Sequence, residues 1–133
     1  MEELINVEFT PDFKRNLRTL AKKYRHIRSD VQPLIEQLEK GETPGDQVQG
    51  VKYVVFKTRV RNSDIKKGKS AGYRIIYYLK SPQNTILVTI YSKSDQSDIS
   101  VQQIRSIIED FDKRSSYDKN MIAIEQEKGD NDR

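Results

Sequence analysis

Residues 73–93 read YRIIYYLKSPQNTILVTIYSK. Two apolar runs rich in isoleucine, valine, threonine and tyrosine flank a short polar segment, SPQN, at residues 81–84. Such runs are typical of β-strands, and a connection of this length is typical of an antiparallel hairpin. The stretch therefore predicts two neighbouring strands at the centre of a sheet.

The chain before this hairpin predicts a third strand, over residues 53–61. Apolar residues alternate there with polar ones, so Phe56 and Val60 face one side while Lys57, Arg59 and Arg61 face the other. The three strands would form a meander. Strict alternation in the last strand puts Ile86, Val88 and Ile90 on one face and Leu87, Thr89, Tyr91 and Lys93 on the other.

Helices are predicted on both sides of the meander. Residues 5–10 read as a short strand, after which Thr10 caps a helix that has Pro11 in its first turn. Two further helices are predicted from capping-box spacings. These pairs are Ser29 with Gln32, in a helix ending near Gly41, and Ser100 with Gln103, in a helix with apolar residues at helical spacing.

Together these elements predict an α+β fold. We expect a small antiparallel sheet of about four strands with a mixed edge, two N-terminal helices and a C-terminal helix. The helices would gather on one face of the sheet and leave the other face free for function. Residues 1–114 would form the domain. Residues 115–133 are too polar to build a packed core and are expected to be a flexible tail.

Composition restricts the kinds of site that the chain can build. It has 133 residues and no cysteine, which excludes disulfides, thiolate metal ligands and a cysteine nucleophile and suits a reducing compartment. Apolar runs stay well below the roughly 18 residues of a membrane span, and the first residues lack the pattern of a signal peptide. We therefore expect a cytoplasmic protein without a membrane partner.

Positive charge is concentrated in one part of the chain. The net charge is +4, yet residues 52–80 contain nine lysines and arginines and a single acid, Asp64. A concentrated basic region is typical of a phosphate-binding surface, and a solvated basic surface is the plain alternative. This region and the strand after it bring Lys57, Arg59, Arg74, Tyr91 and Lys93 toward one face, if the strand registers agree.

These side chains favour phosphate chemistry. The set contains no carboxylate pair, metal-ligand cluster or Ser/His/Asp group, so hydrolytic mechanisms that need them lack their parts. Cleavage of RNA by its own 2′-hydroxyl needs a base, a proton donor and cations around the phosphorus. Lysine, arginine and tyrosine can supply all three. Arg74 is the candidate for gripping the phosphate, whereas Tyr91 can either stack on a base or donate its proton.

The motifs GKSAGYRIIYY, residues 68–78, and ILVTIYSKSDQSDIS, residues 86–100, resemble those of the RelE/ParE toxin superfamily, and HigB-type toxins are the most similar. In that group a basic loop with glycine precedes an arginine-bearing strand, and a strand ending in Tyr-x-Lys precedes a cap rich in serine and acid. The resemblance implies a ribosome-dependent mRNA endonuclease, the toxin of a type II toxin–antitoxin pair, that works without metal or cofactor. Its implied partners are a cognate antitoxin, the ribosome and mRNA.

The resemblance also implies positions for the site. Catalytic roles fall to a set of lysines with one arginine and one tyrosine: Lys57, Lys67, Lys69, Arg74, Tyr91 and Lys93. RNA binding falls to Arg59, Arg61 and Lys66. Some relatives use histidine or glutamate near the end of the sheet, where this chain has Lys93, so a mechanism based on cations is implied.

Two other functions remain open at this stage. The ParE branch of the same fold is associated with gyrase inhibition, which would need a protein-binding surface and no RNA cleavage. A non-catalytic RNA-binding module would keep the basic charge and lack turnover.

Overall fold

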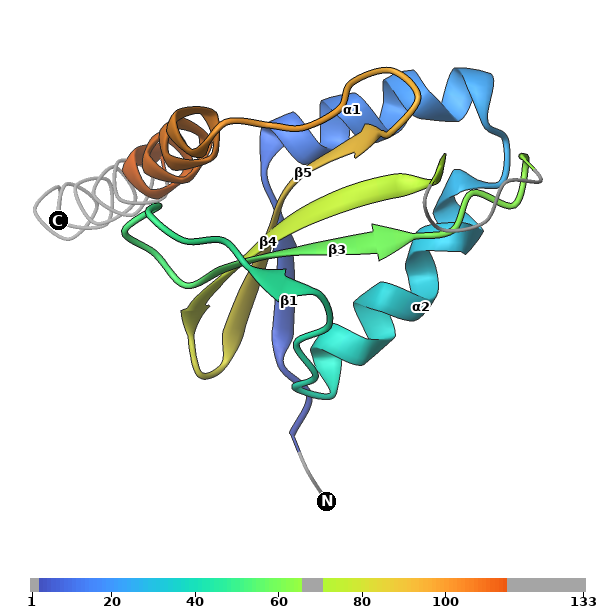
Figure 1. Cartoon of the computed structure of the whole chain (residues 1–133). Coiled ribbons are helices and arrows are strands. Elements are labelled where there is room, and N and C mark those ends of the chain that lie inside the picture. The colour runs from blue at the N-terminus through green and yellow to red at the C-terminus, as the bar shows by residue number, and fades with distance from the viewer. Residues whose placement is uncertain (1–2, 66–70, 115–133) are drawn as a thin grey trace, which may run out of the picture.

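The computed structural model describes residues 3–65 and 71–114. Along the chain lie β1 (Asn6–Phe9), α1 (Pro11–Lys23), α2 (Ile27–Glu39), β2 (Asp46–Gln47), β3 (Val55–Val60), β4 (Tyr73–Ser81) and β5 (Asn84–Ser92). The chain is helical again from 101 to 114, the orange helix of Figure 1. The α+β order of strands and helices predicted from the sequence is confirmed.

The strands form one mixed sheet with the order β1-β5-β4-β3-β2. The meander β3-β4-β5 is antiparallel, as predicted, and β1 pairs in parallel with β5 at one edge. The fifth strand, β2, was not predicted. It consists of two polar residues, Asp46 and Gln47, that pair with Lys57 and Phe56. So short a strand has no periodicity of its own and is defined only by its partner.

Two of the three predicted helix caps are confirmed. Thr10 Oγ1 accepts a hydrogen bond of 3.0 Å from the Phe13 N–H and donates one of 2.6 Å to the Val88 carbonyl, which joins α1 to the sheet. Ser100 and Gln103 form a reciprocal capping box with 3.1 Å bonds in both directions. These caps depend on local spacing, which the sequence displays directly.

The predicted start of α2 was wrong. The helix begins at Ile27 with His26 as its cap, and the Ser29 hydroxyl donates to the His26 carbonyl from within the first turn. A distant residue decides this start, because the Asp64 carboxylate accepts the His26 N–H at 3.0 Å. The end of the helix agrees with expectation, since Gly41 follows the last turn with φ of 86°.

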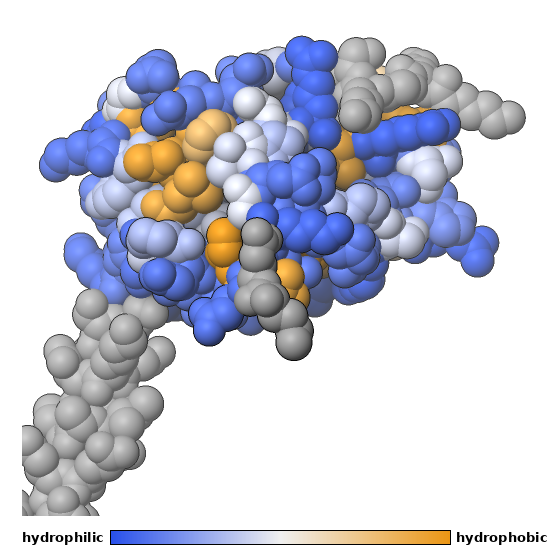
Figure 2. Space-filling view, turned by 90° about the horizontal axis from the view of Figure 1, so that it is seen from below, coloured by the Kyte–Doolittle hydropathy of each residue, from blue (hydrophilic) through white to orange (hydrophobic). Residues whose placement is uncertain are grey.

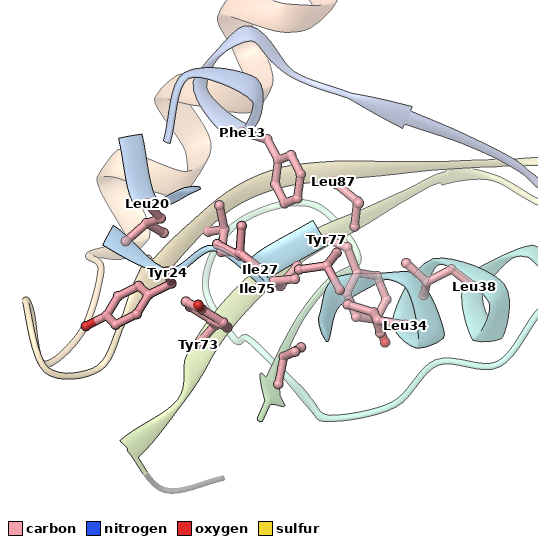
Figure 3. Close-up of a cluster of buried hydrophobic side chains, with 13 residues drawn as sticks. Phe13, Leu20, Tyr24, Ile27, Leu34, Leu38, Tyr73, Ile75, Tyr77 and Leu87 are labelled. Atoms are coloured by element: carbon pink, nitrogen blue, oxygen red, sulfur yellow. The ribbon is translucent and has the colours of Figure 1, made fainter. Parts of the chain in front are cut away.

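Helices cover both faces of the sheet, contrary to the expectation of one covered face. Helices α1 and α2 pack on the face that carries Phe56, Val60, Ile75, Tyr77 and Leu87, and Figure 3 shows this cluster. The helix over 101–114 packs on the opposite face. Its residues Ile104 and Ile108 bury Val55, Ile76, Tyr78, Ile86 and Val88 there. Only the part of that second face beyond this helix is left for a polar site.

A β-bulge corrects the predicted faces of β5. Ile76 pairs with Thr89 but Tyr77 pairs with Leu87, so Val88 is an extra residue between two ladder positions. Beyond the bulge the alternation is reversed. Ile90 therefore lies on the face of α1 and α2 with Leu87, while Tyr91 shares the second face with Val88.

The surface of the described chain is largely hydrophilic. Figure 2 shows apolar residues in limited patches among hydrophilic ones on the face seen from below. Of the large apolar side chains in residues 3–65 and 71–114, Leu4 and Val54 are exposed. No helix within these ranges has the length and apolar character needed to cross a lipid bilayer.

Candidate active site

A row of polar side chains crosses the open part of the second face. Arg59 of β3 lies directly opposite Arg74 of β4, and Arg74 lies directly opposite Tyr91 of β5. Directly opposed side chains in an antiparallel pair lie close together, and like charges in such positions destabilise a sheet. The pair therefore concentrates positive charge on this face of the sheet.

The same face is hollowed into a cleft of about 580 Å³ beside these arginines. We call it the basic cleft, because Lys57, Arg59, Arg74 and Lys93 contribute the charged side chains to its wall together with the single acid Asp46. The remaining lining residues are Pro44, Gly45 and Thr58. Strands β3 and β4 and the segment after β5 thus bring four of the predicted site residues together.

Arg74 is held firmly in this wall. Its side chain is 6% exposed, and Nη1 donates to the Tyr73 carbonyl at 3.3 Å. Burial and the nearby Arg59 charge lower the pKa of Arg74. An arginine nevertheless keeps its charge at neutral pH, so the cleft presents a fixed, partly desolvated cation.

Asp98 joins three groups of the site and was missing from the predicted set. Its Oδ1 accepts from Lys57 Nζ at 3.2 Å, from the Tyr91 hydroxyl at 3.4 Å and from the Ile99 N–H at 2.8 Å. The Ile99 N–H and then Lys57 lower the pKa of Asp98. Asp98 thus contacts two residues of the predicted set. The only sequence signal was the acid and serine segment before the last helix.

Tyr91 is 6% exposed and pairs with Arg74 across the sheet, but it is not among the residues that line the basic cleft. Burial, followed by the Asp98 charge, raises the pKa of its hydroxyl. The phenol therefore stays protonated through the neutral range and can act as a hydrogen-bond donor. Its ring also lines a second cavity, away from the basic cleft.

The other predicted residues are placed differently. Lys93 lies on the cleft, where Nζ donates to the Ser97 carbonyl at 2.6 Å. Arg61 lines a separate cavity of about 210 Å³ between β3 and α2, to which Arg59 also contributes. Lys66, Lys67 and Lys69 lie outside the described residues. Their positions in the site stay predictions.

Two contacts hold the chain just before this undescribed segment. The carboxylate of Asp30 accepts from the backbone and side chain of Ser63 at 2.9 and 3.0 Å. Asp64 accepts from the His26 N–H and, at 2.6 Å, from His26 Nδ1. Asp30 lies in the first turns of α2, and Asp64 binds His26 at the cap of that helix. The start of α2 therefore holds residues 63 and 64 in place.

These contacts predict a pH dependence of stability. The His26 ring and backbone N–H lower the pKa of Asp64, so its contribution is present above the unfolded value of about 3.9 and is lost as the pH falls through the folded value. We expect Asp64→Asn to lose less stability than the unchanged protein between pH 5 and 2.5, measured by urea unfolding. Asp110→Asn, which alters an exposed carboxylate, is the control. Identical pH profiles for Asp64→Asn and the unchanged protein would contradict this account.

Within residues 3–65 and 71–114 no three histidine, aspartate or glutamate side chains are grouped so that they could hold a metal ion.

Comparison with known families gives a match to the model described as the RelE toxin of the RelE/RelB toxin–antitoxin system, over residues 12–128. The chain belongs to the RelE toxin family. It is therefore a toxin of a toxin–antitoxin system, and its family implies an antitoxin partner.

The family match does not test two finer predictions, the HigB type and the domain boundary at residue 114. It does not separate HigB-type toxins from other members, so the closer resemblance to that type stays a prediction. It also runs past residue 114, into chain that the structure does not describe, so the domain boundary placed there stays a prediction. The basic cleft of this RelE-family toxin brings two lysines and two arginines together.

Proposed function

We propose that this toxin is a ribosome-dependent mRNA endonuclease that acts in the cytoplasm, with the ribosome, mRNA and a cognate antitoxin as its partners. The observation that carries the proposal is the opposed pair Arg59 and Arg74 at the wall of a cleft that also has Lys57 and Lys93. Such a group suits a phosphodiester whose charge grows in the transition state.

The proposed reaction uses the RNA's own 2′-hydroxyl as the nucleophile. The hydroxyl loses its proton, its oxygen bonds to phosphorus, and the bond to the 5′ oxygen of the next nucleotide breaks as that oxygen gains a proton. The products are a cyclic 2′,3′-phosphate and a 5′-hydroxyl. Arg74 would hold the nonbridging oxygens, since its guanidinium offers two parallel donors. Arg59, Arg61 and Lys66 would hold the RNA strand.

Proton transfer would be shared among the remaining site residues. Lys57 and Lys93 lie on the cleft, and Lys67 and Lys69 are proposed to join them from the undescribed segment. Asp98 contacts Lys57 and Tyr91 but, in our proposal, positions them instead of reacting. Which lysine accepts the first proton would follow from the dependence of the cleavage rate on pH.

Replacing Tyr91 by phenylalanine separates the two roles open to this side chain. If its hydroxyl donates a hydrogen bond to the departing oxygen, Tyr91→Phe should slow single-turnover cleavage about fivefold to tenfold, the size of one neutral hydrogen bond. The substrate concentration for half-maximal rate should not change. An unchanged rate in Tyr91→Phe, with loss only in Tyr91→Leu, would assign the ring to stacking and refute the donor role.

The experiment that tests the function maps mRNA 5′ ends across the transcriptome after induction in bacteria without the antitoxin. We expect new ends within translated frames for the unchanged toxin and none for Arg74→Ala. Growth arrest with intact messages and DNA damage signals would overturn the proposal in favour of gyrase inhibition. Salt-sensitive RNA binding without arrest or cleavage would overturn it in favour of a binding module.

A further inference from the structure

A second cavity lies between α1 and the helix over 101–114. Its volume is about 340 Å³, and Tyr91 and Thr89 of β5 contribute to its lining. Figure 1 shows the segment after β5 running past α1 on its way to the helix over 101–114. We call this cavity the amide pocket, after the uncharged polar side chains that line it. These are Asn16, Thr89, Gln96, Gln103 and Ser106.

The chemistry of the amide pocket differs from that of the basic cleft. Amide and hydroxyl groups both donate and accept hydrogen bonds, so they suit a neutral planar ligand with mixed donors and acceptors. The charged residues at the pocket are Asp12, Arg15 and Asp110, and Arg15 is already paired with Asp12. A phosphate would meet two carboxylates here, whereas the amino groups of a nucleobase could donate to them.

Hydrogen bonds hold the amides in position before any ligand binds. Asn16 Nδ2 donates to Thr89 Oγ1 at 3.0 Å, and Gln96 Nε2 donates to the Asp98 carbonyl at 3.0 Å. The Gln103 side-chain oxygen serves the cap of the helix, accepting from the Ser100 N–H at 3.1 Å. Its amide nitrogen is then the group that Gln103 offers to a ligand. A site ordered in this way binds with less loss of side-chain entropy.

The amide pocket and the basic cleft are coupled through Asp98. Tyr91 lines the pocket, and its hydroxyl contacts the same carboxylate oxygen that holds Lys57 at the cleft. Gln96, in the pocket, and Lys93, on the cleft, belong to the one segment that leads to Asp98. RNA-binding proteins commonly read single-stranded bases by stacking on an aromatic ring and by hydrogen bonds to the base edge.

We infer that the amide pocket binds one nucleobase of the mRNA next to the cut phosphate and so determines which bases the toxin prefers. This inference rests on the proposed function. Asn16 and Gln96 are then specificity residues, separate from those that grip the phosphate. The alternative ligand is a polar peptide of a partner protein. It fits the observations less well, because a peptide has no phosphate that would link the amide pocket to the basic cleft.

The test compares cleavage of ribosome-bound messages that differ in a single base near the cut. We expect Asn16→Ala and Gln96→Ala each to change the ratio of kcat/KM between preferred and altered message about fivefold. The matched controls are Asn6→Ala, which removes a comparable hydrogen bond to Asn84, and Gln102→Ala on an exposed face of the last helix. Equal losses on every message, with base preference unchanged, would overturn the inference and leave the proposed function intact.

A binding measurement separates failure of the inference from failure of the function. Short 2′-deoxy oligonucleotides, which lack the nucleophile, are titrated into the ¹⁵N-labelled full chain. We expect base-dependent shifts at the amides of Asn16 and Gln96 in the unchanged toxin, and these shifts would support the pocket even if no message were cut. Shifts confined to the cleft residues, or produced only by a peptide of the antitoxin, would overturn it.

Discussion

Arg74→Ala should lower the rate of mRNA cleavage by about 100-fold to 1,000-fold, the loss that follows removal of one charged donor at a developing oxyanion. Arg74 is placed for this effect because it is buried in the wall of the basic cleft, opposite Arg59. Single-turnover cleavage on programmed ribosomes measures the chemical step directly. Arg74→Lys should recover part of the rate, since it restores the charge without the two parallel donors.

The control for this prediction is Arg28→Ala. Arg28 is an exposed arginine of α2, so its removal takes away one positive charge without touching the cleft. We expect its cleavage rate to stay within about twofold, because surface substitutions away from structural features have small effects. Thermal unfolding of each variant shows whether the fold persists. A folded Arg74→Ala toxin that still cleaves at more than a tenth of the normal rate would refute the role given to Arg74.

Gly45→Ala should lower the free energy of unfolding by about 2–4 kcal/mol, through backbone strain together with a steric clash. Gly45 has φ of 95°, and a Cβ there would lie 2.2 Å from the Lys57 carbonyl oxygen. The chain must move away from β3 to make room, and this would displace Pro44 and Asp46 along the wall of the basic cleft. Urea unfolding measures the stability of Gly45→Ala. Single-turnover cleavage by the folded variant then shows whether its cleavage rate falls as well.

Gly50→Ala isolates the backbone strain, so the difference between the two variants gives the steric part of the effect. Gly50 has a similar φ of 82°, but a Cβ added there has nothing within 4 Å. Its substitution should cost only the backbone strain, about 1–2 kcal/mol. Equal destabilisation of the two variants would show that the approach to Lys57 is unimportant.

Local features of the chain could be predicted from the sequence. The β4–β5 hairpin, the caps at Thr10 and Ser100 and the concentration of charge near β3 and β4 depend on residues close together in the chain. So does the placement of Lys57 and Arg59 on one face of β3, because alternation within a strand needs no partner. The meander then brought Arg74 beside Arg59, as expected if the registers agreed.

The features that depend on distant partners were decided by the tertiary structure. Asp64 determines where α2 begins, and the Val88 bulge reverses the faces of β5 so that Ile90 enters the core beneath α1 and α2. The apolar stripe of the last helix predicts burial but does not say on which face of the sheet. In the structure the last helix packs on the second face, and the segment that leads to it places Asp98 in contact with Lys57 and Tyr91. The sequence by itself thus determined the helices and the longer strands, the fold class and the basic strands, but not the short strand β2 or the start of α2. Contacts between residues far apart in the chain decided the composition of the site, because their geometry exists only when the sheet is assembled.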